Sequence, residues 1–221
     1  MVRMTAMRLY ADSANTAAVG SLLRDGVVAG VTTNPTILAK SGRVGADIRA
    51  LHAEWLALGA EELFFQAWGQ TTEELVTTGR AIAALGERTV VKVPASAIGL
   101  PAAAQLARSG VPVLVTAVYG PAQAIAASAV GARYIAPYLG RLEDAGRRGV
   151  DDIAAMDAVL RDTGTSVLVA SLRSPAAIVA LAEAGLRYFT AAPTVLRALF
   201  STPASDAAIA DFDAAAAGWT L

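Results

Sequence analysis

The chain has 221 residues, of which 55% are hydrophobic, and a formal net charge of -1 at pH 7. This length and composition suffice for one well-packed domain, whereas a net charge near zero provides no positive field to attract nucleic acid or a membrane surface. The absence of cysteine excludes disulfides, thiolate nucleophiles and cysteine-ligated metals, and is compatible with a reducing compartment. No signal-peptide pattern is visible, and no apolar run approaches the ~18 to 20 residues that cross a bilayer. We therefore expect a cytoplasmic protein that acts on a small molecule.

Eight short β-like runs alternate with longer Ala- and Leu-rich stretches along the chain. In the longer stretches, such as "LPAAAQLARSG", apolar residues recur at helical spacing and a glycine follows the last turn. This alternation predicts an α/β protein, a single (β/α)8 TIM barrel over residues 1–221 rather than an open doubly wound sheet. The predicted strands cover residues 7–12, 27–34, 62–68, 89–95, 112–118, 133–139, 166–172 and 187–193.

Two further segments carry separate expectations. Residues 141–152, "RLEDAGRRGVDD", are strongly polar and predict a solvated loop between the sixth strand and its helix. Residues 203–221, "PASDAAIADFDAAAAGWTL", follow the eighth strand and its own short helix. We expect an extra C-terminal helix here, which is not needed to close the barrel.

The predicted fourth strand, "TVVKVP", contains a charged side chain among valines. The chain has lysine only at positions 40 and 92, and Lys92 is the one within this apolar run. An unpaired ammonium group inside a barrel is costly, and burial favours its neutral form by lowering its pKa. Because a neutral amine is a nucleophile, Lys92 is the first candidate for a catalytic group.

Polar side chains stand where the predicted strands end. In parallel β/α barrels the carboxyl ends of the strands form one face, and function collects there. Side chains alternate along a strand, so Lys92 shares a face with Val90. The candidates at this face of the barrel are Asp12, Thr33, Asn34, Gln66, Lys92, Thr116, Tyr138, Arg141, Ser171 and Arg173.

Structural roles compete with chemical roles at several of these positions. A strand-end threonine or asparagine commonly caps the next helix, and Thr33 in "TTNPT" suits a turn or cap at least as well as a chemical role. Asp12 and Lys92 also fit a purely structural ion pair, although perturbed charges in a pocket more often belong to a functional site. His52 has no second histidine for a metal site or a catalytic triad, and no phosphate-binding glycine loop is present.

The combination of these side chains suits Schiff-base catalysis. A neutral lysine adds to a ketone, and after loss of water the iminium draws electrons from the neighbouring carbon–carbon bond. A carboxylate such as Asp12 shuttles the protons of addition and dehydration. Paired donors that bind a terminal phosphate are available at the neighbouring strand ends, from Arg141, Ser171 and Arg173. The residues therefore predict carbon–carbon bond cleavage in a phosphorylated ketone.

Several motifs together resemble one enzyme family. The segments "GVTTNPTILAK", "VVKVP", "TAVYG", "YIAPYLGRLED" and "VLVASLRSP" are similar to those of the small class I transaldolases, in the fructose-6-phosphate aldolase branch. The resemblance runs from about Arg8 to the final helix. It implies a barrel that needs neither a metal nor another cofactor, with Lys92 as the Schiff-base residue, Asp12 as the proton-transfer carboxylate and Asn34 as a contact to a substrate hydroxyl.

The resemblance also implies roles for the remaining candidates and for the assembly. Gln66, Thr116 and Tyr138 match the positions that hold the catalytic water in the aldolase branch, whereas transaldolase relatives typically have phenylalanine at position 138. The phosphate site of the family is matched by Arg141, Ser171 and Arg173. Members of the family form homo-oligomeric rings, pentamers or decamers, in which the C-terminal helix reaches a neighbouring subunit.

Three functions are compatible with this sequence. The first is reversible cleavage of fructose 6-phosphate to dihydroxyacetone and glyceraldehyde 3-phosphate. The second is a transaldolase that passes the same three-carbon unit to a sugar-phosphate acceptor; the acidic pair in "RLEDAG" is closer to the transaldolase-like relatives, and the family aldolases often have lysine where Arg173 stands. The third is a non-catalytic sugar-phosphate-binding or scaffold barrel, against which the intact set of Asp12, Lys92 and Tyr138 argues.

Overall fold

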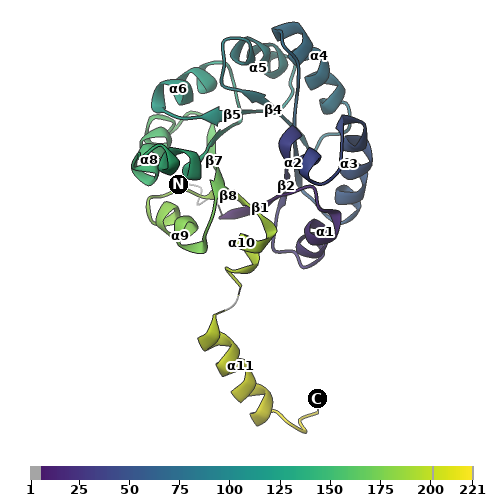
Figure 1. Cartoon of the computed structure of the whole chain (residues 1–221), viewed down its shortest axis with the longest axis vertical. Helices are drawn as coiled ribbons and strands as arrows, with labels where there is room; N and C mark the ends of the chain where they lie inside the picture. Colours follow the sequence, from purple (N-terminus) through teal and green to yellow (C-terminus); the bar gives the residue numbers. More distant parts are fainter. Residues whose placement is uncertain (1–5, 201, 221) are drawn as a thin grey trace.

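The predicted strands close into a parallel barrel in chain order, from β1 to β8 (Figure 1). The computed structural model describes residues 6–200 and 202–220. Within them, β8 pairs with β1 in parallel and completes the ring, which confirms the predicted (β/α)8 barrel. The strands are β1 (Arg8–Asp12), β2 (Gly30–Thr32), β3 (Glu62–Gln66), β4 (Thr89–Pro94), β5 (Val113–Val118), β6 (Tyr134–Pro137), β7 (Ser166–Leu172) and β8 (Tyr188–Ala191).

Helices follow the strands and form a ring around the barrel (Figure 1). Short polar side chains start several of them by accepting a backbone hydrogen bond, as Asn15, Thr71 and Ser174 do. The helices are α1 (Thr16–Arg24), α2 (Pro35–Lys40), the 3₁₀ helix η1 (Gly45–Asp47), α3 (Ile48–Ala57), α4 (Thr72–Ala83), α5 (Gly99–Arg108), α6 (Pro121–Ala129), α7 (Leu139–Asp144), α8 (Gly149–Val159), α9 (Pro175–Glu183), α10 (Pro193–Arg197) and α11 (Pro203–Ala215).

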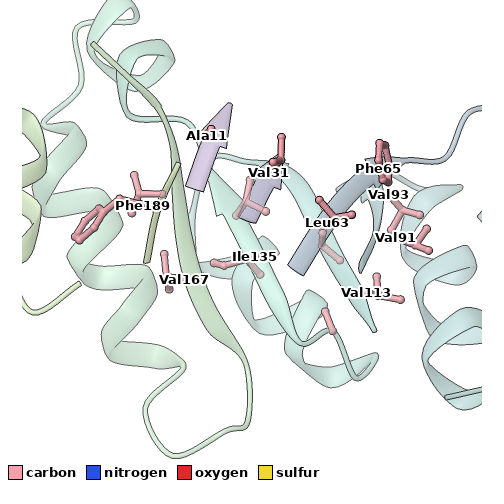
Figure 2. Close-up of a cluster of buried hydrophobic side chains, with 14 of the residues drawn as sticks. Ala11, Val31, Leu63, Phe65, Val91, Val93, Val113, Ile135, Val167 and Phe189 are labelled. Carbon is pink, nitrogen blue, oxygen red and sulfur yellow. The ribbon is translucent and has the colours of Figure 1, made fainter. Parts of the chain in front are cut away.

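Side-chain alternation along the strands gives the barrel two apolar layers. Figure 2 shows the outer layer, in which strand residues such as Val31, Val91 and Ile135 pack toward the helices. The inner layer fills the barrel itself, and its members are Tyr10, Phe64, Val90, Leu114, Tyr134, Ala136 and Leu168. A filled interior is typical of this fold, so ligands bind at an end of the barrel and not within it.

A buried carboxylate closes the end of the barrel where the strands begin. Glu62 accepts hydrogen bonds from the hydroxyls of Tyr10 and Tyr134, at 2.6 and 2.9 Å. It also forms salt bridges to the guanidinium groups of Arg133, at 2.9 Å, and Arg8, at 3.6 Å. Because this charge is paired and hydrogen-bonded, it is tolerated inside the fold. The end formed by the carboxyl termini of the strands is left for function.

Two segments differ in how far they follow the sequence-based expectations. The prediction of a loop over residues 141–152 is wrong in part, because Leu139 and Leu142 are buried and anchor the short helix α7, and α8 already begins at Gly149. The C-terminal helix forms as predicted and projects from the barrel as α11 (Figure 1). Among the described residues, no helix is both long and apolar enough to cross a membrane.

Candidate active site

A polar pocket of about 480 Å³ opens at the carboxyl ends of the strands. Most of the predicted site residues meet there, although they come from elements spread over the whole chain. Those that line the pocket are Asp12, Asn34, Gln66, Lys92, Tyr138, Arg141 and Ser171. The two predicted threonines lie behind this lining, and Arg173 lies beside it.

A larger groove of about 840 Å³ is located elsewhere, near the starts of β1 and β8. Its lining is mainly apolar, with side chains such as Leu9, Val27 and Phe189. None of the predicted site residues lies in it. Size alone therefore does not identify the functional pocket, and the smaller polar pocket holds the chemically capable groups.

Lys92 lies in the wall of the pocket and is only 5% exposed. Its Nζ donates a hydrogen bond of 2.8 Å to the backbone carbonyl of Thr33, from the strand end two positions away in the barrel. Burial lowers the pKa of the Lys92 amine, and the charge of Asp12 raises it by a smaller amount. The side chain of Gln66 is next to Lys92 in strand register and lines the same pocket. The Lys92 side chain is thus held by a hydrogen bond, and its neutral form is favoured relative to that of an exposed lysine.

Asp12 ends β1 and presents its carboxyl group to the pocket while keeping partial solvent exposure. The hydroxyl of Thr32 donates a 2.7 Å hydrogen bond to Oδ1, and Thr32 is itself 2.6 Å from the hydroxyl of Thr190. Enclosure by protein raises the pKa of Asp12, whereas the charge of Lys92 and the bond from Thr32 lower it. The Asp12 carboxyl and the Lys92 amine form no ion pair within 4.0 Å. The absence of such a pair speaks against a purely structural ion pair, and both groups line the same pocket.

Tyr138 and Thr116 form a hydroxyl pair at the ends of β6 and β5. Their oxygens are 2.8 Å apart, and the Tyr119 ring stands edge-on to Tyr138 with centroids 6.0 Å apart. Burial raises the pKa of the Tyr138 phenol, so this group is protonated at neutral pH. Thr116 is buried and reaches the pocket through Tyr138.

Asn34 and Thr33 begin the segment that leads into α2. The Oδ1 of Asn34 accepts a 2.9 Å hydrogen bond from the backbone N–H of Ile37 and so caps the helix, and Asn34 also lines the pocket. The Thr33 hydroxyl instead bonds the carbonyl of Phe64 at 3.3 Å. The side chain of Thr33 therefore has a structural role, whereas its backbone carbonyl accepts the hydrogen bond from Lys92.

The predicted phosphate-binding residues are not all in one place. Arg141 and Ser171 line the pocket, and Ser171 has a φ of 59°, a left-handed conformation next to a break in the pairing of β7 with β8. Arg173 lies outside the lining and forms a two-pronged salt bridge to Asp144, at 2.7 and 2.6 Å. A Cβ at Gly140 would lie 2.7 Å from Nε of Arg173 and 2.8 Å from the backbone oxygen of Ser171, so a larger residue here would displace one of them.

The structure adds residues that the sequence did not single out. Lys40 lines the pocket from the end of α2. Thr32 holds Asp12 by a hydrogen bond, and Asp144 holds Arg173. A partial signal was available for Lys40, since it is the chain's second lysine and stands in the "GVTTNPTILAK" motif. Over residues 6–200 and 202–220, no three His, Asp or Glu side chains gather closely enough to hold a metal ion.

The fold and this pocket together define a β/α-barrel enzyme with a buried lysine at its centre. A family model described as "Transaldolase/Fructose-6-phosphate aldolase" matches residues 9–220. The chain belongs to the transaldolase/fructose-6-phosphate aldolase family, and it is an enzyme of aldolase or transaldolase type.

Individual relatives agree with this membership. A "Probable transaldolase" of Caulobacter sp. (strain K31) is 35% identical, over 93% of this chain and 94% of that protein. One of Hydrogenobaculum sp. (strain Y04AAS1), with the same description, is 33% identical over the same shares. Among solved structures, thiamine phosphate pyrophosphorylase from Pyrococcus furiosus superposes with a TM-score of 0.59 at 12% identity, covering 86% of this chain and 87% of its own. A likeness at such low identity concerns the barrel fold alone.

Proposed function

We propose that the protein is a class I aldolase that reversibly cleaves fructose 6-phosphate into dihydroxyacetone and glyceraldehyde 3-phosphate. The observation that carries this proposal is the buried amine of Lys92, placed in one pocket with the carboxyl of Asp12 but not paired to it. A paired ammonium would be inert, whereas a desolvated amine with a free lone pair attacks a carbonyl.

The first half of the reaction forms the imine and breaks the bond. Nζ of Lys92 adds to the ketone carbon of the substrate, and the carbonyl oxygen leaves as water after it receives two protons, one released by the amine and shuttled by Asp12 and one from solvent. The resulting iminium takes up the electron pair of the cleaved carbon–carbon bond and becomes an enamine. The proton of the adjacent hydroxyl passes to the Asp12 carboxylate as glyceraldehyde 3-phosphate forms. The hydroxyl of Thr32 keeps this carboxylate in place.

The second half releases the three-carbon unit. Protonation of the enamine and attack of water on the imine free dihydroxyacetone and restore Lys92. We assign the positioning of this water to Tyr138, Gln66 and Thr116, of which the first two line the pocket and the third is hydrogen-bonded to Tyr138. The phosphate of the substrate is assigned to Arg141 and Ser171 in the pocket, with Arg173 beside them.

Transfer to a sugar-phosphate acceptor is the second candidate, and the printed names of the curated relatives favour it. The two functions share every step up to the enamine and differ in whether water or an acceptor aldehyde reacts next. A product assay on fructose 6-phosphate, with and without erythrose 4-phosphate, separates them. Glyceraldehyde 3-phosphate without an acceptor supports the aldolase, and formation only with the acceptor supports the transaldolase. A barrel that merely binds sugar phosphates gives product in neither case.

We further propose that the enzyme is a cytoplasmic homo-oligomer, a ring of five subunits or two such rings, as the resemblance implies. Support comes from α11, which lies away from its own barrel and exposes apolar side chains at Ile209, Phe212 and, just beyond the helix, Trp219. Exposed aromatic groups of this size are common at subunit contacts. In this proposal α11 packs on a neighbouring subunit.

A further inference from the structure

Lys40 occupies a place in the pocket that none of the assigned roles uses. It is the last residue of α2, the short helix that Asn34 caps, and α2 lies inside the ring of outer helices near the end of β2 (Figure 1). Pro35, Thr36 and Ile37 line the pocket from the same helix, whereas Leu38 is buried on its other side. Lys40 therefore stands on the pocket-facing side of α2.

The charges around the pocket are unbalanced in favour of cations. Among the described residues, Asp12 is the only carboxylate in the lining, which also contains three cationic side chains, Lys40, Lys92 and Arg141. Lys40 and Arg141 are exposed at the mouth, and neither forms a salt bridge with a described residue. Arg173, just outside, already has a carboxylate partner in Asp144. Two cations that form no salt bridge attract an anionic ligand to a concave site.

These two cations reach the mouth from opposite sides. Lys40 follows β2 and Arg141 follows β6, and these strands lie four places apart in the ring of eight. Lys92 is on β4, which lies midway between β2 and β6 in the ring. A ligand that enters toward Lys92 thus passes between a flexible ammonium group on one side and a guanidinium group on the other.

We propose that Lys40 is a specificity-determining residue that contacts the phosphoryl group of the substrate bound in the pocket, across the mouth from Arg141. This rests on the proposed sugar-phosphate function and deepens it. Lys40 acts on capture of the phosphorylated substrate and therefore on KM, while the chemical steps at Lys92 are untouched. A purely structural role is the competing explanation, because a lysine at the end of a helix also interacts favourably with the last carbonyls.

The chain offers a matched control for that explanation. Arg108 is likewise an exposed cation at the last residue of a helix, α5, and forms no salt bridge with a described residue. It is absent from the pocket lining. Arg108→Gln removes the same charge from the same position of a helix, so it reproduces the change in net charge and helix dipole but not the change in the pocket.

The test compares glyceraldehyde 3-phosphate with unphosphorylated glyceraldehyde as acceptors for dihydroxyacetone. Lys40→Gln should lower kcat/KM for the phosphorylated acceptor about five- to tenfold, through KM, because one exposed charged contact is lost. The unphosphorylated acceptor should be unaffected. Lys40→Arg should retain most of the preference for the phosphorylated acceptor over the unphosphorylated one, and Arg108→Gln should retain all of it. Equal losses for both acceptors, or no loss, would overturn the proposal.

Two further measurements separate this proposal from the proposed function. Borohydride trapping with dihydroxyacetone, which has no phosphate, reports the imine at Lys92. If no imine is trapped, the proposed function is wrong, and the role of Lys40 is then decided by a binding measurement. Titration of glycerol 3-phosphate, which has no carbonyl, reports that binding directly in the wild-type chain and in Lys40→Gln. A five- to tenfold weaker affinity in the variant supports the role of Lys40. Unchanged affinity contradicts it even if the enzyme is an aldolase.

Discussion

The hydroxyls of Tyr138 and Thr116 are 2.8 Å apart and join the ends of two neighbouring strands, β5 and β6, at the wall of the pocket. Burial raises the pKa of the phenol, so Tyr138 keeps its proton at neutral pH. Thr116 is buried and fixes the direction in which the phenol points. A protonated, oriented phenol in the same pocket as Lys92 is suited to hold a water or to donate a proton.

Replacing Tyr138 by phenylalanine should therefore change the fate of the enamine. Without the phenol, protonation and hydrolysis slow, whereas attack on an aldehyde does not need this group. We expect Tyr138→Phe to slow the release of dihydroxyacetone from fructose 6-phosphate by about 10²-fold, the lower end of the range for loss of a general acid–base catalyst. Transfer to erythrose 4-phosphate should be slowed less. Thr116→Val should act in the same direction with a smaller effect. If release and transfer are slowed equally, Tyr138 does not have the proposed role in hydrolysis.

The pH dependence should report the coupling between Lys92 and Asp12. The amine attacks only when neutral, so kcat/KM rises with pH as Lys92 loses its proton, and burial places this rise below the ordinary lysine value of 10.5. The negative charge of Asp12 raises the pKa of Lys92, so Asp12→Asn should move the rise to lower pH. The same variant should lower the maximal rate about 10²- to 10⁴-fold. A pH–rate profile of both proteins checks this, and a shift to higher pH would contradict it.

Arg141 should matter for phosphorylated substrates only. Arg141→Ala removes a pocket-lining cation that has no carboxylate partner among the described residues, so no internal salt bridge is lost with it. We expect KM for fructose 6-phosphate to rise by the equivalent of about 1.5 to 3 kcal/mol, the range for a hydrogen bond to a charged group. Unphosphorylated aldehydes serve as the control. If both substrate types suffer alike, Arg141 is structural.

The C-terminal helix should hold subunits together. A chain that ends before Pro203 lacks α11 and the exposed apolar side chains of Ile209, Phe212 and Trp219, while the barrel keeps all its strands. Light scattering should show a smaller assembly for this truncated chain, with the far-UV circular dichroism of a folded barrel. An assembly of unchanged size would show that α11 is not the contact.

The barrel and its central residues could be predicted because they follow from repetition and alternation. The order of strand, helix and glycine recurs along the chain. Side chains alternate between the two faces of β4, so Lys92 lies on the inner face with Val90. A lysine in such a run is rare enough to mark a site. The same alternation predicted the position of Gln66 and of Thr116.

Other features of the site depend on contacts that the sequence pattern does not encode. The acceptor for Lys92 is the backbone carbonyl of Thr33, and every residue has such a group. The pairing of Arg173 with Asp144 required helix α7, which two buried leucines stabilise within a segment that otherwise has the composition of a loop. Lys40 lines the pocket because α2 lies inside the ring of outer helices (Figure 1), and the direction of a helix after a strand is set by packing.

The central claim is that Lys92 forms a covalent imine with the substrate, and trapping this imine is its most direct test. The protein is incubated with fructose 6-phosphate or dihydroxyacetone, reduced with borohydride, digested and mapped by mass spectrometry. Because Lys40 is the only other lysine and lines the same pocket, it is an internal control for non-specific reaction. The account predicts an adduct on the peptide that contains Lys92, and none in Lys92→Met. An adduct on Lys40 alone, or no adduct with either substrate, would contradict it.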